Sequence, residues 1–219
     1  MYYFPSRQAA GSLLADELEA KYRYEDCAII CLSDGAVMVG AQIAMRLHCV
    51  LTMLLTECIQ LQGETDVFAE MDHLGGVTYN DMYSAGELED IQLENHGYIE
   101  QQKLEKLFEM HRLLGQGGII KKELLRGRNI IAVSDGLTNG LSLRAAVEFL
   151  KPIKTQKLIV ATPFAGIRAI DQMHVLADEI VCINALGEVI SVDHYYEDNT
   201  IPSHEKIIQV IQDIILHWK

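Results

Sequence analysis

The chain has 219 residues, of which 49% are hydrophobic and 22% are charged, and its formal net charge is −13. This composition is that of a globular protein with a sizeable core, and it excludes an intrinsically disordered chain. The negative charge repels polyanions, so neither a nucleic-acid polymer nor an anionic membrane surface is an expected partner, and a small ligand is favoured.

The first part of the chain predicts a strand, a helix and a second strand behind an initial helix. Apolar residues spaced three and four apart predict an amphipathic helix over residues 6–22. An apolar run at 27–32 predicts a buried strand, residues 36–47 return to helical spacing, and residues 50–55 predict another strand. This order is typical of a parallel βαβ unit.

The middle of the chain has a different character. Residues 57–98 are acidic, rich in glycine and interrupted, which predicts an antiparallel flap or excursion. Residues 99–114 then predict a helix that ends at Gly115, Gly117 and Gly118.

The second half alternates strands with helices. Strands are predicted at 129–133, 157–161 and 179–183, and helices at 141–150, at 166–176 and from Ser203 onward. This alternation predicts an α/β fold with a doubly wound parallel sheet, and we expect residues 1–219 to form a single domain.

The cysteines and the amino-terminal residues indicate the cellular compartment. The five cysteines are scattered through apolar runs, which predicts reduced and buried thiols and disfavours a disulfide scaffold. Cys27 and Cys31 have no second pair nearby, so a zinc site is disfavoured, and the histidines show no ligand spacing. Without an apolar signal segment or a run long enough to span a membrane, the expected location is the cytoplasm.

A strand, loop and helix at residues 129–150 form the best-marked functional element. Glycines let the backbone approach an anion, N–H groups at a helix start donate to it, and an acid at the strand tip suits sugar hydroxyls. The same pattern also occurs as ordinary loop chemistry between a strand and a helix. The candidate ribose-binding and phosphate-binding residues are Ser134, Asp135, Gly136, Leu137, Thr138, Asn139, Gly140 and Ser142.

A second tight loop follows the strand at 27–32. Its residues are Ser33, Asp34, Gly35 and Ala36. The ordinary interpretation is a helix start capped by Ser33 or Asp34. The functional one is a second ligand loop, because ligands of open parallel sheets bind beyond the carboxyl ends of the strands.

Together the two loops resemble those of the type I phosphoribosyltransferases, in particular a bacterial group of about this length. The resemblance extends to Phe4, Arg7, Ala10 and Gly11 near the start and to residues 177–182 and 195–198 near the end. It implies a phosphoribosyltransferase-like fold with a variable flap, a homodimer, and a magnesium-dependent glycosyltransferase of nucleotide metabolism. Such an enzyme moves ribose phosphate from phosphoribosyl diphosphate to a nitrogen nucleophile. In the family, the loop at 134–142 holds the ribose and its 5-phosphate, and the loop at 33–36 holds the diphosphate.

Several positions depart from the family pattern. Ser134 replaces the first acid, Asn139 stands where threonine is usual, Asp34 stands where the group carries arginine, and Thr56-Glu57 replaces a basic pair. Two unit charges about 4 Å apart interact by on the order of 4 kcal/mol at an effective dielectric near 20. The charge reversal at Asp34 therefore opposes diphosphate binding, unless a magnesium ion held by Asp34 or Asp135 bridges the carboxylate and the diphosphate.

These departures leave two hypotheses open. The first is an active transferase whose catalytic residues and acceptor the sequence does not identify. The second is a catalytically degenerate phosphoribosyltransferase-like protein that binds a nucleotide or other small phosphorylated ligand as a regulator. The apolar spacing of the first and last helices adds to the expectation of a homodimer, because it exceeds what one sheet is expected to cover.

Overall fold

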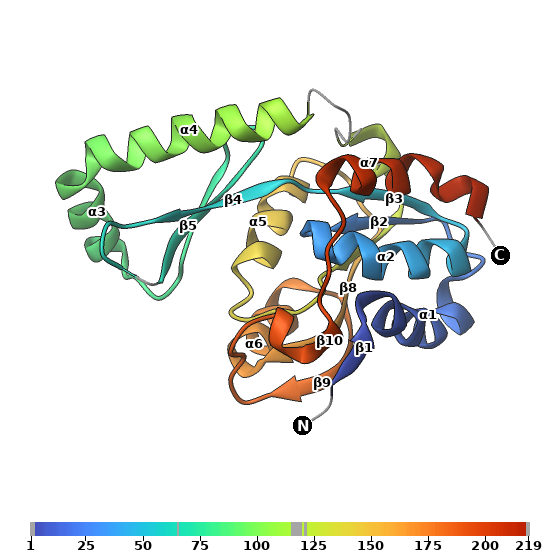
Figure 1. Ribbon diagram of the computed structural model, residues 1–219. Helices are drawn as coiled ribbons and strands as arrows, with labels where there is room; N and C mark the ends of the chain where they lie inside the picture. The colour runs from blue at the N-terminus through green and yellow to red at the C-terminus, as the bar shows by residue number, and fades with distance from the viewer. Residues whose placement is uncertain (1–2, 65, 115–119, 121, 218–219) are drawn as a thin grey trace.

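A five-stranded parallel sheet forms the centre of the molecule (Figure 1). The computed structural model describes residues 3–64, 66–114, 120 and 122–217. Every neighbouring pair of strands in the sheet is parallel, as the alternation of strands and helices predicted. In sheet order the strands are β3 (Val50–Met53), β2 (Cys27–Cys31), β7 (Asn129–Val133), β8 (Lys157–Gly166) and β9 (Glu179–Leu186).

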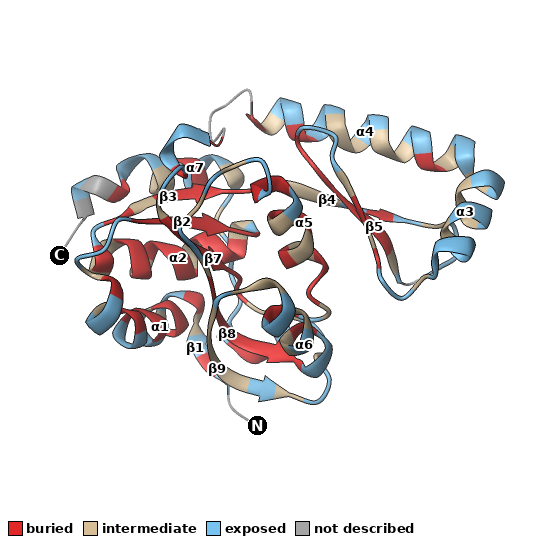
Figure 2. Cartoon of the chain, turned by 180° about the vertical axis from the view of Figure 1, so that it is seen from behind, coloured by how far each residue is buried: buried red, intermediate tan, exposed pale blue. Residues whose placement is uncertain are grey.

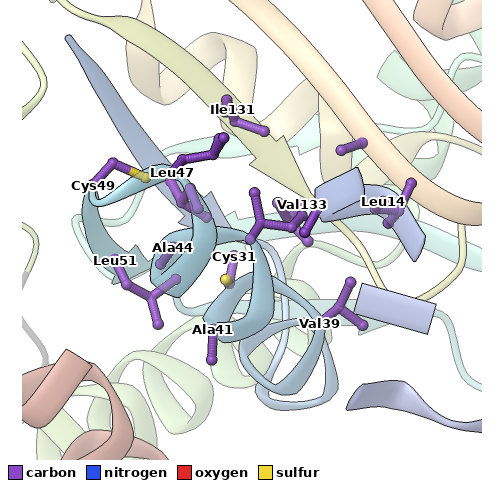
Figure 3. Packing of buried hydrophobic residues seen from close by; sticks show 14 of the residues in the cluster. Leu14, Cys31, Val39, Ala41, Ala44, Leu47, Cys49, Leu51, Ile131 and Val133 are labelled. Atoms are coloured by element: carbon purple, nitrogen blue, oxygen red, sulfur yellow. The ribbon is translucent and has the colours of Figure 1, made fainter. Parts of the chain in front are cut away.

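Helices cover both faces of this sheet, which confirms the doubly wound α/β fold. One buried cluster joins the sheet to α1, α2 and α7, and a second joins its other face to α5 and α6. Figure 3 shows part of the first cluster, which includes Ala44 and Leu47 of α2 and the strand residues Ile131 and Val133. The helices are α1 (Arg7–Tyr22), α2 (Asp34–Leu47), α5 (Leu141–Leu150), α6 (Ile167–Leu176) and α7 (His204–Asp213).

Residues 56–114 form a separate layer, which we call the hood, and it extends away from the central sheet (Figure 1). Its antiparallel sheet agrees with the excursion expected at 57–98. The hood has a buried cluster of its own, including Phe68 and Met110. Its elements are β4 (Thr56–Gln60), β5 (Val67–Asp72), β6 (Val77–Tyr79), α3 (Ala85–Glu94) and α4 (His96–Leu114). Whether the chain forms one domain stays a prediction.

Helix α3 was not predicted. It has no buried residue, as Figure 2 shows, so apolar periodicity gave no signal. Its start is marked by a capping box, in which the hydroxyl of Ser84 caps the helix and Glu87 bonds back to the Ser84 backbone. The glycines expected to end α4, at 115, 117 and 118, lie outside the described residues.

Two short strands and three 3-10 helices complete the described structure. Strand β1 (Phe4–Ser6) pairs in parallel with β10 (Tyr196–Asp198), so the first described residues lie beside a segment near the end of the chain. Rings of Phe4, Phe164 and Tyr195 form part of a buried cluster beneath this pair. The 3-10 helices span Lys122–Leu124, Asp193–Tyr195 and Ile214–His217.

The apolar face of α7 is used inside the chain. Ile207 and Ile208 are buried, and Ile207 packs into the cluster with α1 and α2. This packing removes one reason for expecting a homodimer, which stays a prediction. In the part of the chain that the structure describes, no helix is long and apolar enough to cross a membrane.

The prediction of buried cysteines is wrong at Cys58 and holds only in part at Cys182. All five thiols are free, and Cys27, Cys31 and Cys49 are buried, but Cys182 is half-buried and Cys58 is exposed. Cys58 lies in β4, where its neighbour Ile59 points into the hood core, so the strand alternation directs Cys58 outward. Burial raises the pKa of Cys27 to about 11 and that of Cys49 to about 12, which keeps these two thiols protonated and unreactive.

Candidate active site

The two loops singled out in the sequence meet at the carboxyl edge of the central sheet. Strands β2 and β7 are neighbours, and Cys31 is in register with Val133. Ser33 and Asp135 each lie two residues beyond these positions, and the Ser33 hydroxyl donates to Asp135 Oδ1 at 2.8 Å. The fold therefore places the candidate diphosphate loop directly beside the candidate ribose-binding acid.

A buried arginine holds the other oxygen of Asp135. Arg7 is 2% exposed, and its Nε donates to Asp135 Oδ2 at 2.8 Å. The same guanidinium donates to Asp193 at 2.5 Å and to the carbonyl oxygen of Asn199 at 3.0 Å. Burial lowers the pKa of Arg7, but the hydrogen bonds to Asp193 and Asp135 outweigh that effect and raise it, so the cation is retained.

From the sequence, Arg7 was noted only in the first segment that resembles the family, and Asp193 and Asn199 were not identified. One signal was present in the sequence. Arg7 is the first residue of α1, and a cation in the first turn of a helix opposes the helix dipole, so a specific partner was to be expected.

The backbone and the ring of Tyr196 complete the surroundings of Asp135. The Tyr196 hydroxyl donates to the Asp135 carbonyl oxygen at 2.5 Å, and the Arg7 guanidinium lies 4.7 Å from the centre of its ring. Burial and then the charge of Asp135 raise the pKa of Tyr196, so its phenol remains a donor. Gly35 leaves room for this arrangement, because a Cβ there would lie 2.1 Å from Asp135 Oδ2.

The first half of the loop after β7 is closed on itself. The Ser134 hydroxyl donates to the Gly136 carbonyl oxygen at 3.0 Å and accepts from the Gly136 N–H at 3.1 Å. Leu137 is a core residue, and its N–H donates to the Phe164 carbonyl oxygen of β8 at 3.1 Å. These groups are therefore engaged within the protein.

The second half of this loop is more open. Thr138 is exposed, and Gly140 has a φ of 81°, a left-handed conformation that turns the chain into α5. The carboxamide oxygen of Asn139 accepts the Leu141 N–H at 3.1 Å. The next amides of the first helical turn, including that of Ser142, have no acceptor within the helix and so remain suitable donors for an anion.

A cleft of about 410 Å³ lies next to Asn139. Arg168 and Gln172 of α6 form one side, and Asp81 and Met82 of the hood form the other. Gln172 donates to Asp81 at 2.6 Å, so the hood is joined to the layer of α6 at this cleft.

A larger cavity, of about 500 Å³, opens at the start of α2. We call it the α2 cavity. Ser33, Asp34, Gly35 and Asp135 contribute to its wall, and Thr56 and Glu57 border it from the hood. The loop at the start of α2 and Asn139 of the turn at 138–142 therefore line two different hollows.

Two charges in the α2 cavity have partners that the sequence did not indicate. Ser33 caps α2 by accepting the Ala36 N–H at 2.9 Å, so the Asp34 carboxylate is not the cap. His204, at the start of α7, has its Nδ1 3.1 Å from Asp34 Oδ1. Glu57 pairs with Lys106 of α4 at 3.3 Å.

The oxygen donors of the site fit magnesium only in part. Among the described residues there is no group of three or more His, Cys, Asp or Glu side chains that could hold a metal ion. Both oxygens of Asp135 are already bonded, to Arg7 and Ser33, so Asp34 is the acid with the better access. Magnesium commonly uses one or two carboxylates together with substrate phosphates, so Asp34 fits that role only when a phosphorylated ligand supplies the other oxygens.

Comparisons with known proteins extend over nearly the whole chain. No family model matches it. Two proteins from two Mycobacterium tuberculosis strains, each named "Putative phosphoribosyl transferase", are 24% identical to it over 213 residues. The match covers 95% of this chain and 46% of each relative, so the chain spans about half the length of these curated relatives.

A solved structure has the same fold. The crystal structure of TT1426 from Thermus thermophilus superposes with a TM-score of 0.71 at 21% sequence identity, covering 100% of this chain and 99% of that one. The named relatives, together with the central parallel sheet and its two loops at one edge, confirm the resemblance of this chain to the phosphoribosyltransferases.

Proposed function

We propose that the chain is a phosphoribosyltransferase that uses phosphoribosyl diphosphate, magnesium and a nitrogen nucleophile. The observation that supports this most directly is the open turn at residues 138–142, where Gly140 leads into α5 at the carboxyl edge of the sheet. Backbone amides of the first turn of α5 would hold the 5-phosphate, helped by the dipole of the helix.

Positioning is the main contribution asked of the protein in such a transfer. Phosphate bound at α5 would fix one end of the donor, and Asp34 with magnesium would fix the diphosphate at the other end. The carboxylate of Asp135 already bonds Arg7 and Ser33, so Asp135 would contribute to donor positioning through its backbone and its neighbours.

Specific contacts also favour the second candidate function, a non-catalytic protein that binds a phosphorylated ligand as a regulator. The Ser134 hydroxyl bonds Gly136, and the Asp135 carboxylate is occupied, so two positions that would grip ribose hydroxyls are used internally. In this alternative the open turn at residues 138–142 still binds phosphate, whereas diphosphate binding is lost.

Calorimetric titration with phosphoribosyl diphosphate, with and without magnesium, separates the two functions. The transferase requires binding that magnesium strengthens, followed by release of diphosphate when a nitrogen acceptor is added. The regulator requires binding of phosphate-bearing ligands that magnesium does not strengthen and no release of diphosphate. Absence of phosphoribosyl diphosphate binding in both titrations contradicts the transferase, and absence of binding to nucleotides and inorganic phosphate as well contradicts the regulator.

The variant Gly140→Ala tests whether the open turn at residues 138–142 binds phosphate. A Cβ at this position would meet Gln172 at 3.0 Å and impose a side chain on a left-handed residue, which costs on the order of 1–2 kcal/mol. We expect inorganic phosphate to bind the variant more weakly. Gly86→Ala in α3 is the matched control, because Gly86 has open space around its Cβ position. Equal phosphate affinity in Gly140→Ala and Gly86→Ala would place the phosphate elsewhere.

A further inference from the structure

Positive charge is concentrated in two short loops of this acidic chain. Residues 121–128 and 151–157 contain seven of the 18 Lys and Arg residues but only one of the 31 Asp and Glu residues. The rest of the chain is therefore even more acidic than the net charge of −13 indicates. A small anion that approaches this protein is attracted to these two loops and repelled by most of the remaining surface.

The two loops lie side by side at the amino edge of the central sheet. The first precedes β7 and the second precedes β8, and these strands begin in register with each other. The Gly127 N–H donates to the Lys154 carbonyl oxygen at 2.7 Å, and the Gln156 N–H donates to the Arg128 carbonyl oxygen at 2.9 Å. The backbone therefore holds the loops together, at the sheet edge opposite to the candidate active site.

A pocket of about 280 Å³ is lined by both loops, and we call it the amino-edge pocket. Its wall has three cations, one acid and an apolar part, contributed by Lys122, Arg126, Lys154, Glu123, Pro152 and Ile153. The volume is just below the roughly 300–1,000 Å³ that is usual for sites that enclose a whole small molecule. The pocket therefore suits a compact charged group.

The three cations of the pocket wall have no carboxylate partner among the described residues, whereas cations next to the pocket do. Arg128 and Lys151 pair with acids at 3.0 and 2.6 Å. Lys122 instead lies over the ring of Phe149, 5.2 Å from its centre. The positive charge of the amino-edge pocket is therefore not neutralised by the described part of the chain.

The end of α5 offers a second role for cations at this place. The helix ends at Leu150, and positive charge near a helix carboxyl terminus is favourable. That role predicts lower stability when the cations are removed, and it predicts no bound anion. Stability and anion binding, measured on the same variants, therefore distinguish the two roles.

We propose that the amino-edge pocket binds a small soluble anion with linked phosphate groups, such as an oligophosphate or the phosphate tail of a nucleotide. Arginine and lysine are the side chains suited to phosphate, and three of them spread over two loops can contact several phosphate oxygens at once. A long polyanion or an anionic bilayer would also meet the acidic remainder of the surface, which favours a small ligand. The ligand is additional to the donor of the proposed function, which would bind at the opposite sheet edge.

Inorganic triphosphate is the probe, and NMR of backbone amides locates its binding. Gly127 reports on the joined loops, and Gly140 reports on the turn before α5. At about 0.15 M salt, where screening acts over about 8 Å, triphosphate should shift the Gly127 resonance. The same shift should occur in Gly140→Ala, because the turn before α5 is not part of the amino-edge pocket.

Variants of the pocket wall make the test specific. Arg126→Gln and Lys154→Gln should each weaken triphosphate binding, followed at Gly127, by roughly ten-fold, the value of one hydrogen bond to a charged group. Lys151→Gln is the matched control, because it removes the same charge from an adjacent residue that already pairs with Glu148 and lies outside the pocket wall. It should weaken binding much less. Thermal melts of all three variants measure the contribution of these cations to stability.

Three results would overturn the inference: no Gly127 shift in the unmodified protein, unchanged affinity in both wall variants, or an equal loss in the Lys151→Gln control. Vesicles of phosphatidylglycerol that shift Gly127 when triphosphate does not would also overturn it, since the patch would then face a membrane. Failure of the proposed function has a different signature. Loss of phosphate binding at Gly140 leaves the Gly127 result unchanged.

Discussion

Replacing Arg7 with methionine should destabilise the protein more than any single change to a surface ion pair. The substitution removes the buried cation but keeps an unbranched side chain of similar length. Asp135 loses its 2.8 Å partner while its side chain is only 9% exposed, so a carboxylate is left buried with one hydroxyl donor. Breaking a buried pair in this way typically costs about 3–5 kcal/mol.

The other contacts of Arg7 change this figure little. Asp193 is 58% exposed and can be solvated by water, so its loss contributes roughly 0–1 kcal/mol. The carbonyl oxygen of Asn199 loses one hydrogen bond, worth about 1 kcal/mol. We therefore expect the free energy of unfolding to fall by about 4 kcal/mol.

Urea unfolding followed by circular dichroism measures this loss. Arg46→Met is the matched control, because Arg46 pairs with Glu19 and Asp16 at the surface and should lose only about 0–1 kcal/mol. Adding Asp135→Asn to Arg7→Met should recover part of the stability by removing the unpaired charge. A loss in Arg7→Met no larger than in Arg46→Met, with no recovery in the double variant, would refute the buried-pair reasoning.

Three other changes test the site and the hood. Gly35→Ala should lower the melting temperature, because the Cβ of the alanine would lie 2.1 Å from Asp135 Oδ2. In an ordinary helix alanine is instead favoured over glycine by about 1 kcal/mol, so a raised melting temperature would contradict the close approach. Asp34→Arg should strengthen magnesium-free diphosphate binding by on the order of ten-fold at low salt, a gain that shrinks as ionic strength rises. Magnesium-dependent binding should instead weaken if Asp34 helps to hold the ion, and unchanged calorimetry in both conditions would mean that the loop does not face diphosphate. Burial raises the pKa of Glu70 above its usual 4.5, so the native state binds this proton more tightly than the unfolded state, and the free energy of unfolding should fall as pH rises from 4.5 through the folded pKa. Urea unfolding of Glu70→Gln over the same pH range should lack that fall. Parallel curves for the variant and the unmodified protein would contradict this assignment.

The central sheet was predictable because its strands and helices are separated by clear boundaries. β7 and α5 begin and end at the predicted residues, since an apolar run stops at Ser134 and a glycine precedes the helix. β1, β10 and α3 were not predicted. Strands of three residues are too short to show alternation, and an exposed helix has no apolar face to reveal it.

The candidate site was predictable only in part. The order of parallel strands was enough to bring Ser33 and Asp135 to one edge. The partners of these loops come from distant parts of the chain: Arg7 is 128 residues from Asp135, and His204 is 170 residues from Asp34. Such pairings depend on how the helices pack over the sheet, and one sequence holds no local pattern that specifies them.

The pairing of β1 with β10 has a consequence for how the protein is made. Arg7 is synthesised 186 residues before its partner Asp193, and the strand that pairs with β1 follows later still. Until then the guanidinium must remain in water or rely on Asp135 alone. A ribosome that stalls before Asp193 would therefore release a chain whose sheet can form but whose ligand edge cannot close, and such a chain should be a good substrate for proteases.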